Sequence, residues 1–334
     1  MTDLSAGGIE IVNIHRIRVD TTPIAVECFA DTVAFILAEE QVLLISPRGE
    51  ERMQRVHRGA ILSSCATNNR LLTGGDDGQI VCLCENGRST TLITDERRRW
   101  IDAVGVASGG SFAWSIGKEA FCRTKDGVQT SIQVPSSVGG LAFAHDRCRL
   151  AIAHYNGVTL WEPENESSAF MLSSKGSHLQ PSFSPDGTVL VSTMREPTLH
   201  AWSMEGNSNL QTPGYPRNVV SIDWTSDGRF LATSGTDRLT LLSFQIADNP
   251  LARMPLLLAP YSSLVSAVVC HPAKNIVAVG YSDGLVLLVR IPDGAEILIK
   301  APDHSSIIAM RWSRSGSRLG IASENGQCRV VTVK

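Results

Sequence analysis

A repeating unit of about forty residues is the feature of this sequence that most constrains its fold. Each copy contains a short apolar run, a turn, a second apolar run that ends in small residues, a turn rich in Gly, Asp or Asn, and a third apolar run. The clearest copy comprises residues 181–187, 189–193 and 199–202, and further copies begin at residues 222 and 310. A period of this length indicates an array in which each unit buries its apolar face against the next.

The local pattern within each unit predicts β-strands rather than helices. Each run has four to seven residues, is rich in Val, Ile, Leu and Thr, and is bounded by Gly, Asp, Asn or Ser. The Asp-Gly and Ser-Gly pairs supply the residues with positive φ that tight hairpins need. The sequence holds no helical stripe longer than two turns. We therefore expect an all-β fold.

These residues resemble the WD-repeat β-propeller family. Its unit carries an aromatic-Ser-Pro-Asp-Gly turn, a strand of the Leu-Ala-Ser-Gly-x-Asp type and a Trp-Asp pair. The first two parts match well here, whereas the pair is degenerate, with Trp161-Glu162 and Trp202-Ser203 as its nearest relatives. The resemblance runs from about Ile9 to Val333. It implies a fold and says little about function.

The resemblance implies one closed propeller domain over residues 1–334. Counting the first turn of each unit gives eight four-stranded blades, with seven, the commoner number in the family, as the alternative. The final unit offers three strands, so an N-terminal strand is expected to complete the last blade and to hide sheet edges. The expected blades are residues 22–58, 60–95, 100–134, 136–173, 177–212, 218–258, 262–300, and 305–333 together with 9–20.

The composition argues against several classes of partner. With 30 Lys and Arg residues against 33 Asp and Glu residues, the net charge is -3, without the basic excess typical of nucleic-acid binding. No apolar stretch approaches the roughly 20 residues that span a bilayer, and residues 1–10 lack the pattern of a secretory signal. We therefore expect a cytoplasmic protein with reduced cysteines, and neither nucleic acid nor membrane as a partner.

The sequence offers no positive sign of catalysis. It lacks the Gly-x-Ser-x-Gly, His-Glu-x-x-His, P-loop and Gly-x-Gly-x-x-Gly motifs. Cys65, Cys82 and Cys84 could supply thiolates to a tetrahedral zinc site, but cysteines in apolar strands are usually buried core residues. We therefore expect no enzyme activity, no catalytic residue, no cofactor and no metal site.

Several histidines precede the first strand of a unit. In the family, a His at this place hydrogen-bonds through a Ser or Thr to an Asp in the turn between the second and third strands. The resemblance implies that His57 pairs with Thr73 and Asp77, and that His304 pairs with Ser323, with Asn325 as an open second partner. Such groups brace a blade and are not catalytic.

One set of loops carries the residues that dominate protein interfaces. In the family, the loops that enter each blade and those between its second and third strands form a face that binds partners. Tyr, Trp and Arg are enriched in interface hot spots, and Arg matches carboxylates and phosphates with two parallel hydrogen bonds. We therefore expect this face to bind a protein or peptide, acidic or phosphorylated. The predicted contact residues are Arg58, Arg97, Arg98, Arg99, Trp100, Tyr155, Arg195, Tyr215, Arg217, Arg238, Tyr261 and Tyr281.

Two classes of function remain open on these grounds. The first is a non-catalytic scaffold, a monomer or a subunit of a hetero-complex, that binds a partner protein or peptide on this face. The alternative is a propeller, enzymatic or not, that holds a small molecule or a metal in its central channel.

Overall fold

The computed structural model describes residues 9–67, 69–145, 148–164, 169–205, 209–212, 214–244 and 254–334. The other parts of the expected blades, including residues 146–147, 165–168, 206–208 and 245–253, lie outside the described residues. All regular elements in the described part are β-strands, which confirms the all-β prediction. No helix that could cross a membrane occurs within these ranges.

The chain divides into two compact units, Met1–Gln54 with Tyr215–Lys334, and Arg55–Gly214. The prediction of one closed domain stays a prediction.

The first unit contains four antiparallel sheets of four strands each. Short turns such as residues 30–31, 282–285 and 324–326 connect neighbouring strands, as the Gly- and Asp-rich punctuation of the sequence predicts. The sheets comprise β2 (Pro23–Phe29), β3 (Thr32–Leu37), β4 (Gln41–Ile45) and β5 (Glu51–Arg55); β20 (Ile222–Trp224), β21 (Phe230–Thr233), β22 (Leu239–Ser243) and β23 (Leu256–Leu258); β24 (Val265–Cys270), β25 (Ile276–Tyr281), β26 (Val286–Arg290) and β27 (Glu296–Lys300); and β28 (Ile307–Trp312), β29 (Arg318–Ser323), β30 (Gln327–Val333) and β1 (Ile11–Arg18).

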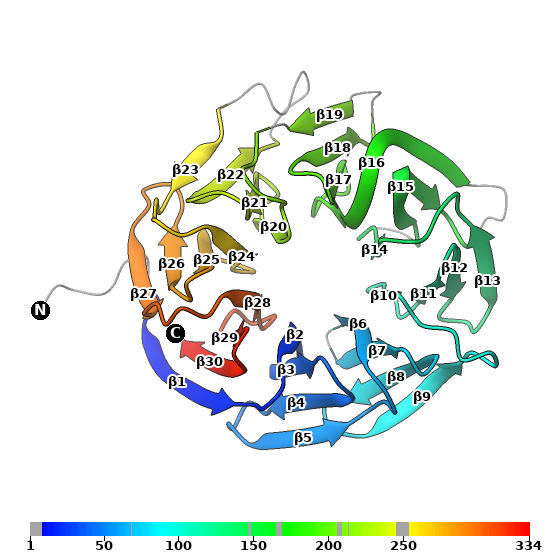
Figure 1. Cartoon of the computed structure of the whole chain (residues 1–334), viewed down its shortest axis with the longest axis horizontal. Coiled ribbons are helices and arrows are strands. Elements are labelled where there is room, and N and C mark those ends of the chain that lie inside the picture. Colours follow the sequence, from blue (N-terminus) through cyan, green and yellow to red (C-terminus); the bar gives the residue numbers. More distant parts are fainter. Residues whose placement is uncertain are drawn as a thin grey trace, which may run out of the picture. The chain divides into compact units, whose positions relative to one another are not determined.

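The N-terminal strand completes the last of these sheets, as predicted. β1 pairs antiparallel with β30 from Ile11 opposite Val333 to Arg18 opposite Gln327, and Figure 1 shows the two strands side by side. The backbone N–H of Lys334 also donates to the carbonyl of Glu10 at 3.0 Å. Ile9 is 2% exposed and packs into the same apolar cluster as Val333. The first and the last strand of the described chain therefore share one sheet.

The apolar core of the first unit lies between the faces of neighbouring sheets. One cluster joins Ile276 and Val286 to Ile307 and Ile321, which come from two different sheets. Strands β3, β25 and β29 are buried along their whole length. Continuous apolar runs in the sequence therefore mark strands that are covered on both faces.

The second unit contains two four-stranded sheets and one six-stranded sheet. These sheets comprise β6 (Ile61–Ala66), β7 (Arg70–Gly75), β8 (Gln79–Cys84) and β9 (Ser89–Thr94); β10 (Ala103–Val106), β11 (Phe112–Ile116), β12 (Glu119–Arg123) and β13 (Gln129–Gln133); and β14 (Gly140–Phe143), β15 (Leu150–Trp161), β16 (Ala169–Phe183), β17 (Val189–Met194), β18 (Leu199–Ser203) and β19 (Asn209–Thr212).

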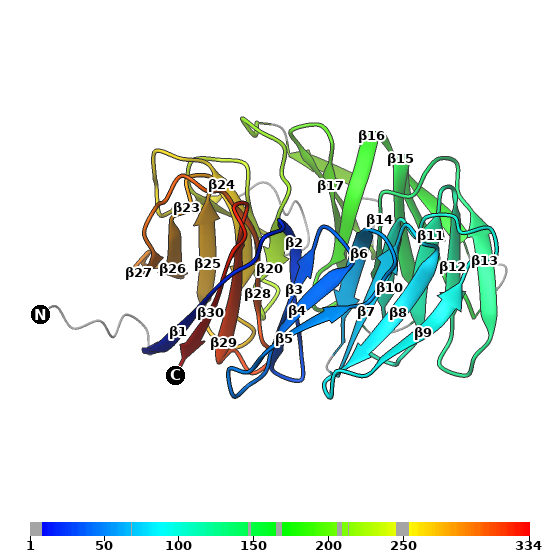
Figure 2. The ribbon, with the colours of Figure 1, turned by 60° about the horizontal axis from the view of Figure 1, so that its bottom comes forward.

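The six-stranded sheet contains two of the predicted units. β16 is 15 residues long and lies beside β15 (Figure 2). Its first part, from Ala169 to Ser177, pairs with β15 across one register shift, and its last part, from His178 to Phe183, pairs with β17. The expected blades 136–173 and 177–212 therefore merge through one continuous strand. The described strands form seven sheets, which is the alternative count of the prediction. The eight units expected from the sequence give seven sheets because two of those units share the six-stranded sheet.

Candidate functional site

The most exposed cationic and aromatic segment of the second unit is the loop after β9. We call residues Arg97, Arg98, Arg99 and Trp100 the Arg-Trp loop. All four side chains are exposed, and Trp100 is 62% exposed. An indole this exposed covers little of the protein's own core, so its apolar surface is available to a partner.

Hydrogen bonds hold the backbone of the Arg-Trp loop in one conformation. The N–H of Arg98 donates to the carbonyl of Asp95 at 2.9 Å, and the N–H of Arg99 donates to Oδ2 of Asp95 at 2.8 Å. Arg99 Nη2 donates to Oδ1 of the same carboxylate at 2.7 Å, and this hydrogen bond lowers the pKa of Asp95. Arg99 is therefore neutralised by Asp95. Among the described residues, the guanidinium groups of Arg97 and Arg98 form no ion pair.

The turn between β7 and β8 holds both ends of the Arg-Trp loop through backbone hydrogen bonds. The N–H of Asp95 donates to the carbonyl of Gly78 at 2.8 Å, and the N–H of Ile101 donates to the carbonyl of Gly75 at 3.1 Å. Gly78 has a φ of +77°, and a Cβ atom there would lie 2.8 Å from the Cα of Arg98. The loop and the turn are thus in backbone contact, which only glycine permits.

The same turn also positions Arg58, through the predicted histidine brace. His57 Nδ1 donates to Oδ1 of Asp77 at 3.0 Å, and its Nε2 lies 2.8 Å from Oγ1 of Thr73. The other oxygen of Asp77 accepts the backbone N–H of Arg58 at 3.0 Å. The prediction for His57 is confirmed. Arg58 and the Arg-Trp loop are therefore brought together, because both are held by the turn that contains Asp77 and Gly78.

The corresponding prediction for His304 is wrong. His304 is exposed with a φ of +63°, while Ser323 is buried. The neighbouring Ser305 acts as the brace instead, since its Oγ accepts the backbone N–H of Asn325 at 3.1 Å.

Two further predicted contact residues of the second unit belong to the six-stranded sheet, Tyr155 within β15 and Arg195 just after β17. Tyr155 is 56% exposed, and its backbone N–H donates to Oγ of Ser136 at 2.8 Å. Arg195 is exposed, and its backbone N–H donates to the carbonyl of Ser177 at 2.9 Å. Both side chains are available to a partner.

The tyrosines of the first unit are less available than predicted. Tyr281 is 0% exposed, and its hydroxyl donates to the carbonyl of Ala259 at 2.6 Å. The prediction that Tyr281 lies on the surface is therefore wrong. As the last residue of the buried strand β25, it belongs to the core. Tyr261 is partly buried and packs edge-on against Tyr281, with ring centroids 5.1 Å apart. The hydroxyl of Tyr215 lies 3.0 Å from Oγ1 of Thr233. Burial raises the pKa of the Tyr215 hydroxyl to about 12.

The arginines of the first unit differ in their surroundings. Arg217 is exposed. Arg238 forms two hydrogen bonds with the carboxylate of Asp237, at 2.7 and 2.9 Å, so its charge is locally balanced. Their contact with a partner stays a prediction.

The cysteines considered for zinc do not form a metal centre. Within the described ranges, no group of three or more His, Cys, Asp or Glu side chains has the arrangement that could hold a metal ion. Cys82 is buried, and burial raises the pKa of its thiol to about 11. A thiol with so high a pKa is a poor ligand and a poor nucleophile at neutral pH.

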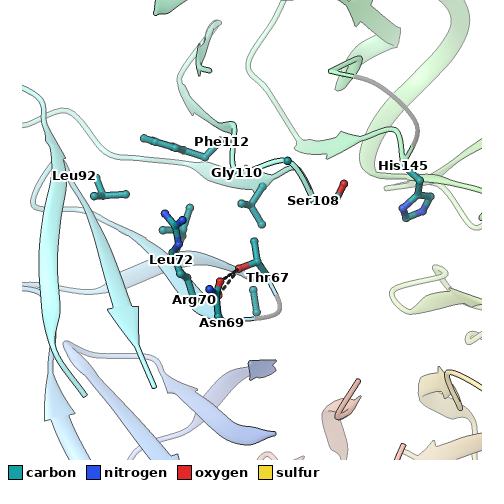
Figure 3. A pocket seen from close by; sticks show the side chains of 12 residues that line it. Thr67, Asn69, Arg70, Leu72, Leu92, Ser108, Gly110, Phe112 and His145 are labelled. Carbon is teal, nitrogen blue, oxygen red and sulfur yellow. Dashed lines mark hydrogen bonds between the residues drawn. The ribbon is translucent and has the colours of Figure 1, made fainter. Parts of the chain in front are cut away.

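The structure also contains a pocket that the sequence did not predict. It has a volume of about 620 Å³ and lies between the sheet of β6–β9 and that of β10–β13 (Figure 3). Its walls come from turns that are about forty residues apart in the sequence. The residues of these turns form no recognisable binding motif. The only signal in the sequence was the recurrence of these turns at the same place in successive units.

Comparison with known protein families and curated proteins finds partial matches. A family model described as WD domain, G-beta repeat, matches residues 207–241. Subunit 5 of transcription initiation factor TFIID from Caenorhabditis elegans is 29% identical over 134 residues, which cover 40% of this chain and 20% of that protein. Elongator complex protein 2 from Danio rerio is 22% identical over 201 residues, which cover 52% of this chain and 23% of that protein. The chain thus spans about a fifth of the length of these relatives.

Solved structures resemble a larger part of the chain. The computationally designed Ika8 protein aligns with a TM-score of 0.72 at 16% identity, over 94% of this chain and 97% of its own. The WD40 repeats of RRP9 align with a TM-score of 0.64 at 17% identity, over 85% and 97%. U3-55K aligns with a TM-score of 0.63 at 17% identity, over 84% and 98%. At these identities the likeness concerns the fold alone.

Proposed function

We propose that this chain, a WD-repeat β-propeller, is a non-catalytic interaction subunit that binds an acidic or phosphorylated partner protein through Arg58 and the Arg-Trp loop. The observation that carries the proposal is the presence of Arg97, Arg98 and Trp100 on a backbone already fixed by hydrogen bonds. The guanidinium groups of Arg97 and Arg98 can recognise a negative charge, and the neighbouring indole of Trp100 offers a large apolar contact area.

The fixed backbone favours binding because less conformational entropy is lost when the partner docks. Free loops must be ordered on association, and each immobilised side chain costs about 0.5–1.5 kcal/mol. Here the turn that contains Asp77 and Gly78 orders both Arg58 and the Arg-Trp loop in advance. Only the side chains of Arg58, Arg97, Arg98 and Trp100 remain to be fixed by the partner.

The curated relatives support a role inside a complex. One is named as a subunit of a transcription initiation factor and the other as a protein of a complex. An acidic or phosphorylated partner is favoured by the two guanidinium groups that no carboxylate of the described structure neutralises. The net charge of -3 for the whole chain disfavours long nucleic acid as the ligand of this small basic site.

The test has two steps. Affinity capture from native extract identifies a partner, and calorimetry with the purified partner measures its Kd for the native chain and for variants. We expect Arg98→Ala and Trp100→Ala each to weaken binding by about tenfold or more, as hot-spot truncations do. Arg88→Ala, at an exposed arginine of another turn in the same sheet, is the matched control and should leave the Kd unchanged. Unchanged binding by both loop variants would overturn the proposal.

A further inference from the structure

We infer that the pocket between the sheets of β6–β9 and β10–β13 is a second docking site, which takes a peptide with a bulky apolar side chain next to a carboxylate. We call it the anchor pocket. Its turns precede β7 and β11, whereas the Arg-Trp loop follows β9, so the inference does not depend on the function proposed above. Its volume of about 620 Å³ falls within the range of about 300–1,000 Å³ typical of ligand sites.

One wall of the anchor pocket is apolar and rigid. It is formed by Leu72, Leu92, Val106 and Phe112. The ring of Phe112 stacks on Trp114 with centroids 5.6 Å apart, and Trp114 in turn stacks on Phe121 at 5.2 Å. Phe112 is nevertheless only half-buried, and it lines the open space of the pocket (Figure 3). A fixed aromatic surface with one side uncovered suits a bulky apolar side chain.

The charge of the lining favours an anion. Its twelve residues include one permanent cation, Arg70, and no Asp or Glu. Arg70 is exposed at the start of β7 and forms no ion pair within the described part of the chain. Figure 3 shows its guanidinium directed toward Phe112, so the cation and the apolar wall face the same space. One guanidinium matches one carboxylate with two parallel hydrogen bonds.

The rim of the pocket is pre-formed and open. The N–H of Thr67 donates to the carbonyl of Arg70 at 2.8 Å, and the N–H of Gly110 donates to the carbonyl of Ala107 at 3.0 Å, so both turns are closed by backbone hydrogen bonds. A Cβ atom added to Gly109 would meet no atom within 4 Å. Because no side chain covers the rim there, a peptide backbone can approach it closely, which favours a peptide over a fully enclosed small molecule.

Methyl NMR of the full-length chain with two labelled residue types, Leu and Val, tests this inference. The probe is the peptide Gly-Ser-Glu-Phe-Asp-Ser-Gly, and its controls replace Phe with Ala or both acidic residues with Lys. We expect the probe to shift the methyl signals of Leu72, Leu92 and Val106, and each control peptide to bind at least tenfold more weakly. Methyl signals that stay unmoved at millimolar probe, or equal shifts with either control peptide, would overturn the inference. So would equally tight binding of 3-phenylpropionate, since the peptide backbone would then contribute nothing.

Variants separate this site from the Arg-Trp loop. Arg70→Gln should weaken probe binding about tenfold, and Gly109→Leu should block the rim without touching the core. Arg88→Gln is the charge-matched control and should bind the probe normally, as should Arg98→Ala. The methyl spectrum itself verifies folding of each variant. If Arg98→Ala abolished probe binding while Arg70→Gln did not, the probe would be binding the Arg-Trp loop and the anchor pocket would be refuted, with the function proposed above untouched.

Discussion

A Cβ atom on Gly78 would lie 2.8 Å from the Cα of Arg98, so the turn after β7 and the Arg-Trp loop touch through their backbones. Gly78→Ala should therefore push the loop away and also strain the turn, whose φ at this residue is +77°. The strain of a left-handed residue alone costs about 1–2 kcal/mol in the free energy of unfolding. Gly127→Ala is the matched control, because Gly127 has a φ of +87° but an added Cβ meets nothing within 4 Å.

We expect both glycine variants to lose stability in urea unfolding, and Gly78→Ala to lose more. Only Gly78→Ala should also weaken partner binding, by at least as much as Arg98→Ala does. Equal stability losses combined with normal partner binding in both variants would show that the backbone contact has no role in presenting the loop.

The carboxylate of Asp77 should make stability depend on pH in acid. Burial raises its pKa, but hydrogen bonds from the N–H of Arg58 and from His57 outweigh burial and hold the pKa below the usual 3.8. A depressed carboxyl pKa stabilises the folded state above pH 3.8, and this contribution is lost as the pH falls through the lower folded value. Asp77→Asn should therefore cost about 1–3 kcal/mol at pH 7.

Urea unfolding at pH 7 and near pH 3 measures this effect. The difference in unfolding free energy between the native chain and Asp77→Asn should shrink at the lower pH, since below pH 3.8 the carboxyl group binds a proton more readily in the unfolded chain than in the folded one. Asp126→Asn, at an exposed turn residue, should match the native chain at both pH values. A difference for Asp77→Asn that is the same at pH 7 and pH 3 contradicts the assigned hydrogen bonds.

The sequence pattern was sufficient for the parts of the fold that depend on local chemistry and on repetition. Alternating apolar runs and Asp-Gly turns determine where strands begin and end, and the incomplete final repeat predicted the pairing of β1 with β30. The brace of His57 with Thr73 and Asp77 was predictable because the family resemblance places a His just before the first strand of a blade and its partners within that blade.

Features that depend on the third dimension were not predictable in the same way. Tyr281 looks like a loop residue by repeat position, yet it ends a strand that is buried along its length. The joining of two expected blades into one sheet follows from the pairing of β16 with both β15 and β17, which no side-chain pattern specifies. The anchor pocket combines Arg70 and Phe112 from different repeats, and neither residue type is unusual where it stands.

His178 should make the second unit lose stability in mild acid. It is 1% exposed and contacts Trp202 with ring centroids 5.4 Å apart, and burial lowers its pKa from 6.5 to about 4. Between these values the unfolded chain binds the proton and the folded chain does not, so the stability that is present above pH 6.5 falls as the pH drops toward 4. The loss amounts to roughly 3 kcal/mol.

His178→Phe should remove this dependence because Phe keeps a ring against Trp202 but does not titrate. At pH 7 the variant should be about 1 kcal/mol less stable, since the 3.3 Å hydrogen bond from Nε2 to the carbonyl of Ser174 is lost. At pH 4.5 it should match or exceed the native chain. His304→Gln, at an exposed histidine, serves as the control, and parallel pH profiles for His178→Phe and the native chain would refute the assignment.

Removing the N-terminal strand should expose an edge that the fold otherwise covers. A chain that begins after Arg18 would leave β30 with unpaired backbone groups from Gln327 to Val333 and would uncover the cluster that buries Ile9. Open, apolar sheet edges pair with other chains. We therefore expect the shortened chain to unfold at a lower urea concentration than the native chain. Size-exclusion chromatography with light scattering should show oligomers of the shortened chain, whereas the elution of the native chain should not change on dilution. A peptide of residues 9–20 added in trans should restore the stability by pairing with β30. A shortened chain as stable and as monodisperse as the native one would show that β1 contributes nothing to the sheet it completes.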